Sequence, residues 1–435
     1  MIKMMWIPIV LFGLLRGVWC ALIIPPWQGP DEPMHFALAA SSAAGTMSDE
    51  QRVRMEGEVI RSMAHYRFWE LTGQVEPDPL PSIIRSSAGI PAPTLYHRIL
   101  GVWLRAAGLP APDGTWPGSA ETGALVRSGR MLSVCMHGCA AALLWWASML
   151  ISGSPPFAVL TSLLFLAHPQ MTFIGACLNS DNLLVLLAGL TVFLMSRALV
   201  NERRWARGLL LLLCVVAPVA KRAGLAITLT ALPVAVLPEL RDRRRVLRAA
   251  GAALAVIAMA AGGLWLAGMG RSMLVDIKEV LGVGGWVGER PHGWWRTFAS
   301  HFWDTFWGSY GWVQCTLPAW CLRVIGVLTA TALVMAPVGV RRLPSRRGLG
   351  LMLLISAVQV VLAVGQVVIA QGMRNELGQG RHAFVCLPGL SLLMAAGVRG
   401  LAPPAREAWL PAVGLVAVVL GEAVIWFVAV PCFLR

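Results

Sequence analysis

Long apolar runs alternate with shorter polar segments along most of the chain. About 20 consecutive apolar residues are needed for a helix to cross a bilayer. Runs that reach or approach this length lie at residues 5–24, 131–151, 156–176, 182–200, 208–220, 223–238, 247–268, 319–340, 348–370, 383–399 and 409–430. The pattern predicts an all-α polytopic membrane protein with about 11 transmembrane helices. It leaves open whether 208–238 forms two helices or one broken helix, because Lys221 and Arg222 interrupt that run.

Two long polar stretches separate the apolar runs into groups. We therefore divide the chain into a first helix, a first loop, six helices, a second loop and four helices, at residues 1–24, 25–130, 131–268, 269–318 and 319–435. The first loop is itself predicted to be helical at 33–44, 49–69 and 94–107. Ser48 and Gln51 have the spacing of a capping box, which marks the start of a helix.

The second loop is rich in tryptophan and contains a candidate cysteine pair. The tryptophans are Trp286, Trp294, Trp295, Trp303, Trp307 and Trp312. Anchoring at the membrane interface is our preferred interpretation of these rings, ahead of stacking on sugars. Cys315 and Cys321 are the cysteine pair with an outer-face location, and a disulfide between them is our expectation.

Composition and charge support the membrane interpretation. Hydrophobic residues make up 57% of the chain and charged residues 13%, which is about half the usual share in soluble proteins. The formal net charge of +14 would suggest a nucleic-acid partner in a soluble protein. Here the arginines flank apolar runs, so we expect membrane lipid and no nucleic acid as their partner.

The arginines also predict an orientation. They concentrate in four short loops, at 203–207, 241–248, 341–347 and 399–406, whereas the alternate loops carry few cations. Cytoplasmic loops are enriched in Lys and Arg. The N-terminus is therefore expected in the cytoplasm, and both long loops and the C-terminus outside.

Several chemical classes are absent from the sequence. It has no GxxxxGK[ST] phosphate-binding loop, no HExxH, no CxxC and no DxD. These absences argue against ATP-driven pumps, zinc peptidases of the HExxH type and the metal-dependent nucleotide-sugar transferases. We expect no cofactor, without excluding a divalent metal.

The most informative motif follows the first apolar run. Asp31 and Glu32 lie between prolines at the start of a predicted helix, where the dipole and free N–H groups favour an ionised carboxylate. His35 lies four residues after Asp31 and can reach the same face. Helix capping accounts for one acid, but less well for two acids and a histidine. We therefore expect Asp31 or Glu32 to be a general base, with Asp31 preferred.

Cations and polar groups on the outer face are candidates for binding an anionic substrate. The candidate cations in short outer loops are Lys221, Arg222, Arg374 and Arg381. We expect at least one to bind a lipid phosphate, although snorkelling to the interface is the alternative for each. Asn179 and Asp181 lie at the outer end of another helix, where Asp181 would orient an acceptor or a metal, or simply cap that helix.

These motifs together resemble a family of predicted bacterial membrane proteins related to the GT-C glycosyltransferases. The main match is Pro-x-x-x-Pro-Asp-Glu-Pro-x-His-Phe at 26–36. Further matches follow in the same order at Ala92–His97, Arg130–Ser133, His168-Pro169 with Asn179–Asp181, Lys221, and Gly380–His382 with Leu387-Pro388. Within them, Tyr96, His97 and His382 fall on positions that the family uses near its site, and both histidines replace the usual tyrosines.

The resemblance implies a GT-C-like fold and a membrane-embedded glycosyltransferase of the bacterial inner membrane. Such an enzyme would take a sugar from a polyprenyl-phosphate donor and transfer it, with inversion, to a hydroxyl of a glycan, lipid or protein acceptor on the periplasmic face. Tyr96 and His382 would contact substrate. The alternatives are a lipid-carrier transporter or flippase, and a non-catalytic envelope-assembly protein. Neither the sugar nor the acceptor follows from the sequence.

Two charges fall inside apolar runs. Arg16 precedes Pro25 by nine residues, and Glu422 lies within the last run. An unpaired charge at the bilayer centre costs about 2.5–3.5 kcal/mol on insertion scales. We therefore expect Arg16 to face protein or a polar headgroup, and the same reasoning applies to Glu422.

Overall fold

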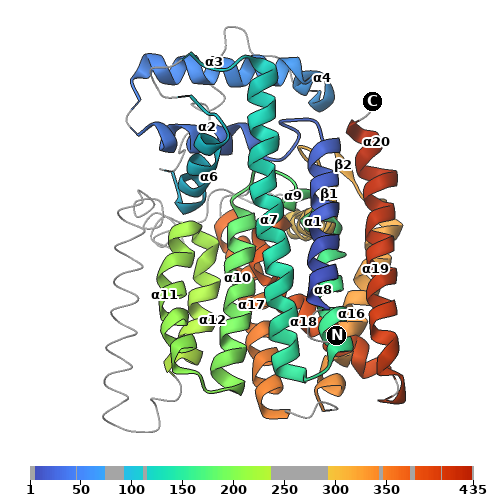
Figure 1. The fold of residues 1–435 in the computed structure, drawn as a ribbon. Coiled ribbons are helices and arrows are strands. Elements are labelled where there is room, and N and C mark those ends of the chain that lie inside the picture. The colour runs from blue at the N-terminus through green and yellow to red at the C-terminus, as the bar shows by residue number, and fades with distance from the viewer. Residues whose placement is uncertain are drawn as a thin grey trace.

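The structure is a computed structural model that describes residues 5–45, 47–73, 93–110, 115–236, 292–341, 346–372, 378–402 and 404–433. In these ranges the chain is helical apart from turns, loops and one two-stranded hairpin, β1 (Ser309–Tyr310) and β2 (Cys315–Thr316). A bundle of long helices carries a layer of shorter helices at one end (Figure 1). The predicted all-α polytopic class is confirmed.

Among the described residues, seven helical segments are long and apolar enough to cross a membrane. They are α1 (Trp6–Ile23), α7 (Ser119–Ser152), α10 (Asp181–Val200), α16 (Ala319–Arg341), the 352–369 part of α17 (Arg346–Gly372), η4 with α18 (Gly380–Leu401) and the segment Glu407–Phe433 that contains α19 (Leu410–Val424) and α20 (Val430–Phe433). The pair α8 (Pro155–Leu166) and α9 (Pro169–Gly175) bends by 70° and makes an eighth if counted as one span.

The count differs from the predicted 11 in three places. The run at 156–176 is not one straight helix, because Pro169 begins a new helix after the bend. The run at 208–238 forms two helices, α11 (Arg204–Ala220) and α12 (Leu225–Val236), and both are shorter than 18 residues. The predicted helix 247–268 lies outside the described residues.

Helix α7 connects the bundle to the layer of shorter helices at its end, which we call the outer layer. It begins at Ser119, 12 residues before the predicted helix, and has 34 residues. At 1.5 Å per residue it is about 51 Å long, well beyond a hydrocarbon core of about 30 Å. Its N-terminal part therefore rises above the bundle, and α3 packs against it there (Figure 1). Residues 119–130, which the sequence assigns to the first loop, form the first turns of α7.

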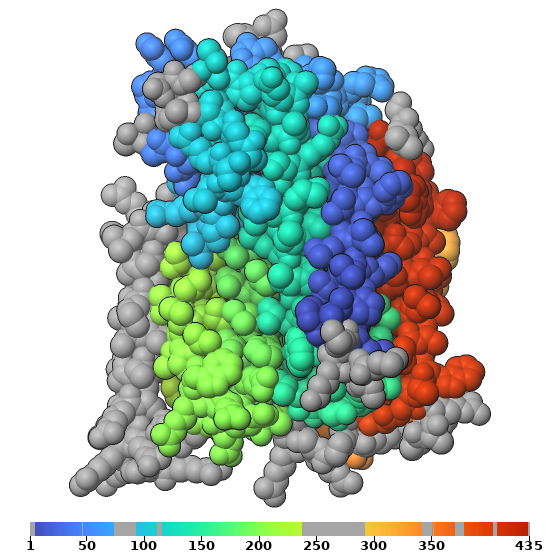
Figure 2. Space-filling model, in the orientation of Figure 1, coloured from blue at the N-terminus to red at the C-terminus, as the bar shows by residue number. Residues whose placement is uncertain are grey.

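The outer layer consists of the helices of the first loop, which cover one end of the bundle in Figure 2. They are α2 (Glu32–Ala44), α3 (Asp49–His65), α4 (Phe68–Thr72) and α6 (Leu95–Ala106). The predicted helices at 33–44 and 94–107 and the Ser48–Gln51 capping box are confirmed. The helix predicted at 49–69 instead ends at His65, and Arg67 then takes a left-handed φ of 57°.

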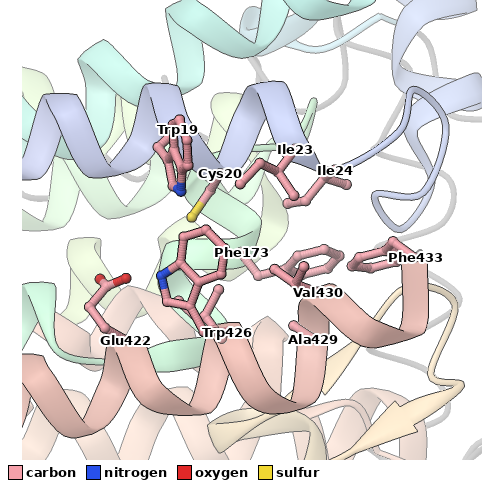
Figure 3. A pocket seen from close by; sticks show the side chains of 11 residues that line it. Trp19, Cys20, Ile23, Ile24, Phe173, Glu422, Trp426, Ala429, Val430 and Phe433 are labelled. Carbon is pink, nitrogen blue, oxygen red and sulfur yellow. The ribbon is translucent and has the colours of Figure 1, made fainter.

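A narrow apolar crevice lies between α1 and the C-terminal helices (Figure 3). Trp19 and Trp426 approach across it with ring centroids 5.9 Å apart. At the end of the crevice that Glu422 lines, Arg16 pairs with Glu422. Arg16 also donates to the carbonyl of Leu166, which the α8–α9 bend leaves free of helical hydrogen bonds. The expectation that Arg16 faces protein is confirmed, since only 7% of the residue is exposed.

The cysteine pairing was predicted wrongly. Cys315 in β2 is bonded to Cys432 in α20, and Cys321 is free. Cys321 lies in the first turns of α16, whereas the hairpin folds back against the C-terminal helices. The disulfide therefore joins the second loop to α20 at the end of the bundle that carries the outer layer.

Candidate active site

A tight loop links α1 to α2 and positions the two acids. Trp27 and Asp31 take left-handed backbone angles, with φ of 74° and 62°. Asp is one of the few non-glycine residues that adopt this conformation readily. Gly29 has no room for a side chain, because a Cβ there would lie 2.6 Å from Cβ of Cys177. The loop is thus held against the α9–α10 connection.

Glu32 forms a buried ion pair with Arg130, and neither residue has any exposed surface. Arg130 donates from Nε and Nη2 to the carboxylate at 2.8 and 2.7 Å. Its remaining donors bind the carbonyls of Ala21, Ile24 and Pro25. The carboxylate also accepts the N–H groups of Gly29 and Leu178. Glu32 therefore joins α1, α2, α7 and the α9–α10 connection, and has no oxygen open to a substrate.

Asp31 forms a different kind of pair. Its carboxylate accepts a 2.7 Å hydrogen bond from Nη2 of Arg381, and its side chain keeps 36% exposure. Arg381 is nine-tenths buried, yet its Nε and Nη1 have no hydrogen-bond partner in the part of the chain that the structure describes. One guanidinium thus holds the carboxylate and keeps two buried nitrogens whose hydrogen-bonding capacity is unused within the described residues.

The charges around Asp31 keep it ionised. Burial raises the pKa of the carboxyl group, but Arg381, His35 and His382 outweigh this effect and lower the pKa to about 2. A carboxylate in this state accepts protons only weakly. It becomes a stronger base if another anion takes up part of the charge of Arg381.

Arg381 is held in place by the second loop. It lies in η4 (Gly380–Cys386), which packs against α15 (Trp294–Trp307). The Gly380 N–H donates to Oγ1 of Thr305 at 2.7 Å. A Cβ at Gly380 would lie 2.2 Å from the Phe302 carbonyl oxygen, so only glycine allows this close approach. The second loop therefore positions the cation that faces Asp31.

A second ion pair lies close to the first. Lys221 follows α11 and pairs with Asp181, the first residue of α10. Oδ1 of Asn179 accepts the Asp181 N–H at 2.9 Å, and its Nδ2 reaches the Pro30 carbonyl at 3.5 Å. Oδ2 of Asp181 is buried and has no hydrogen-bond partner among the described residues. One oxygen of this carboxylate therefore lacks a donor within the described residues.

Histidines fill the space beside the two pairs. His35 and His97 are stacked, with centroids 5.2 Å apart, and Nδ1 of His35 lies 3.0 Å from Nε2 of His97. Tyr96 is fully buried and contacts both rings edge-on. The charges of both ion pairs act on His35 and on His382. The site therefore combines acceptors, cations and neutral rings within a small volume.

The chain matches the model of one family, described as "Predicted membrane protein (DUF2142)", over residues 120–389. This region is more than half of the chain. The protein belongs to the DUF2142 family. No curated protein and no solved structure matches it. The DUF2142 region contains Asp181, Lys221 and Arg381, whereas Asp31 and Glu32 precede it.

The structure brings together most of the predicted site residues. The two ion pairs, Asp31–Arg381 and Asp181–Lys221, lie close to His35 and His382. Tyr96 contacts His35, and Asn179 binds the backbone of Asp181. Arg222 begins the short helix η2 (Arg222–Gly224) next to Lys221. Glu32 is separated from this group by its pairing with Arg130. Arg374 lies outside the described residues.

Sequence reasoning missed two members of the site region. Arg130 was noted only as part of a helix-start motif, although its place in an otherwise apolar helix signals a buried partner. His97 was noted only as a replacement for tyrosine. The tryptophans were also interpreted too simply, because Trp307 stacks on His168 at 4.5 Å inside the protein. Within the described residues, no group of three or more His, Cys, Asp or Glu side chains is placed to hold a metal ion.

Proposed function

We propose that the protein is a membrane-embedded glycosyltransferase of the GT-C type. It transfers a sugar from a polyprenyl-phosphate donor to an acceptor hydroxyl at the outer face of a bacterial inner membrane. The observation that carries the proposal is the guanidinium of Arg381, which binds Asp31 through Nη2 while its buried Nε and Nη1 have no hydrogen-bond partner among the described residues. A base and an oxyanion site on one cation suit the displacement of a phosphate by a hydroxyl group.

The chemistry follows from this arrangement. Asp31 accepts the proton of the acceptor hydroxyl while the hydroxyl oxygen attacks the anomeric carbon. The bond between that carbon and the phosphate oxygen breaks, and its electrons remain on the phosphate. Arg381 and Lys221 stabilise the charge of the departing polyprenyl phosphate. Attack from the face opposite the phosphate inverts the anomeric centre.

Binding of the donor also activates the base. In the free site Arg381 lowers the pKa of Asp31 to about 2. When the phosphate engages Nε or Nη1, which lie on opposite edges of the guanidinium, the positive charge is shared between two anions, and the pKa of Asp31 rises. Asp31 therefore becomes a competent proton acceptor only when a donor is present.

The position of the site relative to the membrane supports the proposal. The pairs lie where the outer layer meets the bundle, at the ends of α1 and α10. We expect the phosphate of a lipid-linked donor to lie at this depth. The disulfide between Cys315 and Cys432 lies at this end of the bundle, and disulfides persist in oxidising compartments. This agrees with an outer location for both loops.

Orientation can be tested by cysteine labelling. A single cysteine replacing Arg52 in α3 should react with an impermeant maleimide added outside, and one replacing Arg204 should not. The opposite result would place the site in the cytoplasm and remove the proposed periplasmic reaction.

Activity is tested with purified protein in lipid nanodiscs. We expect radiolabelled polyprenyl-phosphate sugars to lose their sugar in the presence of an acceptor mixture, with release of polyprenyl phosphate. The matched control is the Asp31→Asn variant, because Asn retains the left-handed conformation. Equal release by both proteins would contradict the proposal.

A lipid-carrier transporter is the second candidate, and one observation favours it. The bend between α8 and α9 is a broken helix within the membrane, a feature common in transporters. However, Arg16 and Thr172 bind the Leu166 carbonyl freed by the break. A transporter would move lipid between leaflets without releasing sugar, and the same nanodisc preparation distinguishes this outcome.

A further inference from the structure

The hydrogen bonds around His97 run in one direction. The backbone N–H of Thr94 donates to Nδ1 of His97 at 3.0 Å, and Oγ1 of Thr94 lies 2.9 Å from the same nitrogen. Because a backbone N–H can only donate, Nδ1 carries no proton, and the hydroxyl group is the donor in its own contact. A neutral imidazole then carries its single proton on the other nitrogen. Nε2 of His97 is therefore the donor in the 3.0 Å contact with Nδ1 of His35. By the same rule, His35 carries its proton on Nε2.

Both rings remain neutral under ordinary conditions. Burial, together with Lys221 and Arg381, lowers the pKa of His35 to about 4, despite the opposing effects of Asp31 and Asp181. The pKa of His97 falls to about 2, because of burial and the proximity of His35 and Lys221. His35 is thus a hydrogen-bond donor at Nε2 that neither gains nor loses a proton near pH 7.

The Nε2–H group of His35 belongs to a ring on which the charges of both ion pairs act. No other described residue forms a hydrogen bond with its Nε2, and Asp31, Asp181, Lys221 and Arg381 all act on the ring. A neutral N–H beside two cations adds to the binding of an anionic oxygen. An unprotonated nitrogen at the same point would oppose it.

We propose that His97 is a positioning residue that holds His35 as a neutral Nε2–H donor, and that this donor binds an oxygen of the lipid-linked phosphate. The assignment rests on the proposed function for its ligand, but not for the state of the two rings. The chain of hydrogen bonds that fixes the two rings begins at the backbone N–H of Thr94, the residue that caps α6. Helix α6 therefore determines which nitrogen of His35 carries the proton.

Two substitutions at His97 make a matched pair. In the His97→Gln variant the side-chain oxygen can accept the Thr94 N–H, as in an ordinary capping box, while the amide donates to His35. In the His97→Glu variant the same cap forms, but the free oxygen can only accept. His35 must then move its proton to Nδ1, which leaves Nε2 as an acceptor facing the phosphate.

The state of His35 is measured by ¹⁵N NMR on histidine-labelled protein in nanodiscs, and affinity by titration with unglycosylated polyprenyl phosphate. We expect the Nε2–H form of His35 in the parent protein and the His97→Gln variant, with similar affinities. The His97→Glu variant should show the Nδ1–H form and bind at least about tenfold more weakly, the usual consequence of losing a hydrogen bond to a charged group.

A control separates the effect of the proton position on His35 from the effect of the negative charge that Glu adds at position 97. In a His35→Phe background the difference in affinity between the Gln and Glu variants should largely disappear, because the effect acts through His35. A persistent difference there, or the Nδ1–H form of His35 in the parent protein, would overturn the proposal. If the Nε2–H form and phosphate binding are found but no sugar is transferred, the proposed function fails and the His35 assignment stands.

Discussion

Asp31 and Glu32 are neighbours in sequence, but their ion pairs differ in almost every physical respect. Glu32 and Arg130 are fully buried, and every donor of the guanidinium is used within the protein. Asp31 remains partly exposed, and its partner Arg381 keeps two nitrogens without a partner among the described residues. One pair is complete without a ligand, whereas the other is not.

The difference indicates how a membrane protein can use two similar motifs for separate purposes. A buried charge is tolerated when all of its hydrogen bonds are satisfied, and such a pair fixes the relative positions of the elements that it joins. An incompletely satisfied pair at a partly exposed position is able to exchange partners. The Glu32–Arg130 pair therefore supports the loop that presents the Asp31–Arg381 pair.

The largest effect is expected at the buried pair. Glu32→Gln leaves the charge of Arg130 without a counterion, and removal of one member of a buried pair typically costs about 3–5 kcal/mol. We expect little folded protein, or a clearly lower unfolding temperature in detergent. The double change Glu32→Gln with Arg130→Met should recover part of the loss. A fully stable single variant would show that this pair does not hold the loop.

Removal of the base should leave the fold intact and abolish most turnover. General-base assistance is typically worth 10²–10⁴-fold in rate. Asp31→Asn should therefore lower the rate of sugar transfer by about that factor, with normal expression. Polyprenyl phosphate should bind at least as tightly as to the parent protein, because no second anion then shares Arg381. Turnover close to that of the parent protein would assign the base elsewhere.

Changing the shared cation should act mainly on the donor. Arg381→Lys keeps the charge but loses the fork that lets one side chain bind two anions. We expect the apparent donor affinity to fall by about tenfold or more, with a smaller change for the acceptor. Lys221→Met provides the comparison for the second pair. Donor affinity unaffected by either change would remove the phosphate role of both residues.

The smallest expected effect concerns pH. The pKa of Asp31 is lowered to about 2, so the contribution of its ion pair to stability is present above the ordinary value of 3.8 and is lost as the pH falls through about 2. In the Arg381→Gln variant the main lowering influence is gone and burial remains, so the pKa of Asp31 should rise. The residual rate should then fall at a higher pH on the acidic side than in the parent protein.

Local features were well predicted from the sequence. The apolar runs, the Ser48–Gln51 capping box and the helices at 33–44 and 94–107 depend on residues close together in the chain. The early start of α7 was missed because 119–130 contains Glu121, Arg127 and Arg130 and does not look like a membrane helix. The polar part of α7 is stabilised by contacts with the outer layer, and a hydropathy pattern contains no information about such contacts.

Contacts between distant segments were not predictable. Asp31 and Arg381 are 350 residues apart, and the sequence placed both on the outer face without pairing them. The same limit explains the wrong disulfide, since Cys321 is near Cys315 in sequence but Cys432 is near it in space. The choice between Asp31 and Glu32 also depended on Arg130, which lies on another helix.

The pairing of Arg16 with Glu422 has a consequence for biosynthesis. Arg16 enters the membrane with the first helix, whereas α19 is translated only after nearly the whole chain. Throughout that interval the guanidinium has no counterion from α19, and the carbonyl of Leu166 is also made well after α1. Insertion of α1 is therefore provisional until α19 arrives. Nascent chains arrested before α19 should be cleared by membrane proteases faster than complete ones.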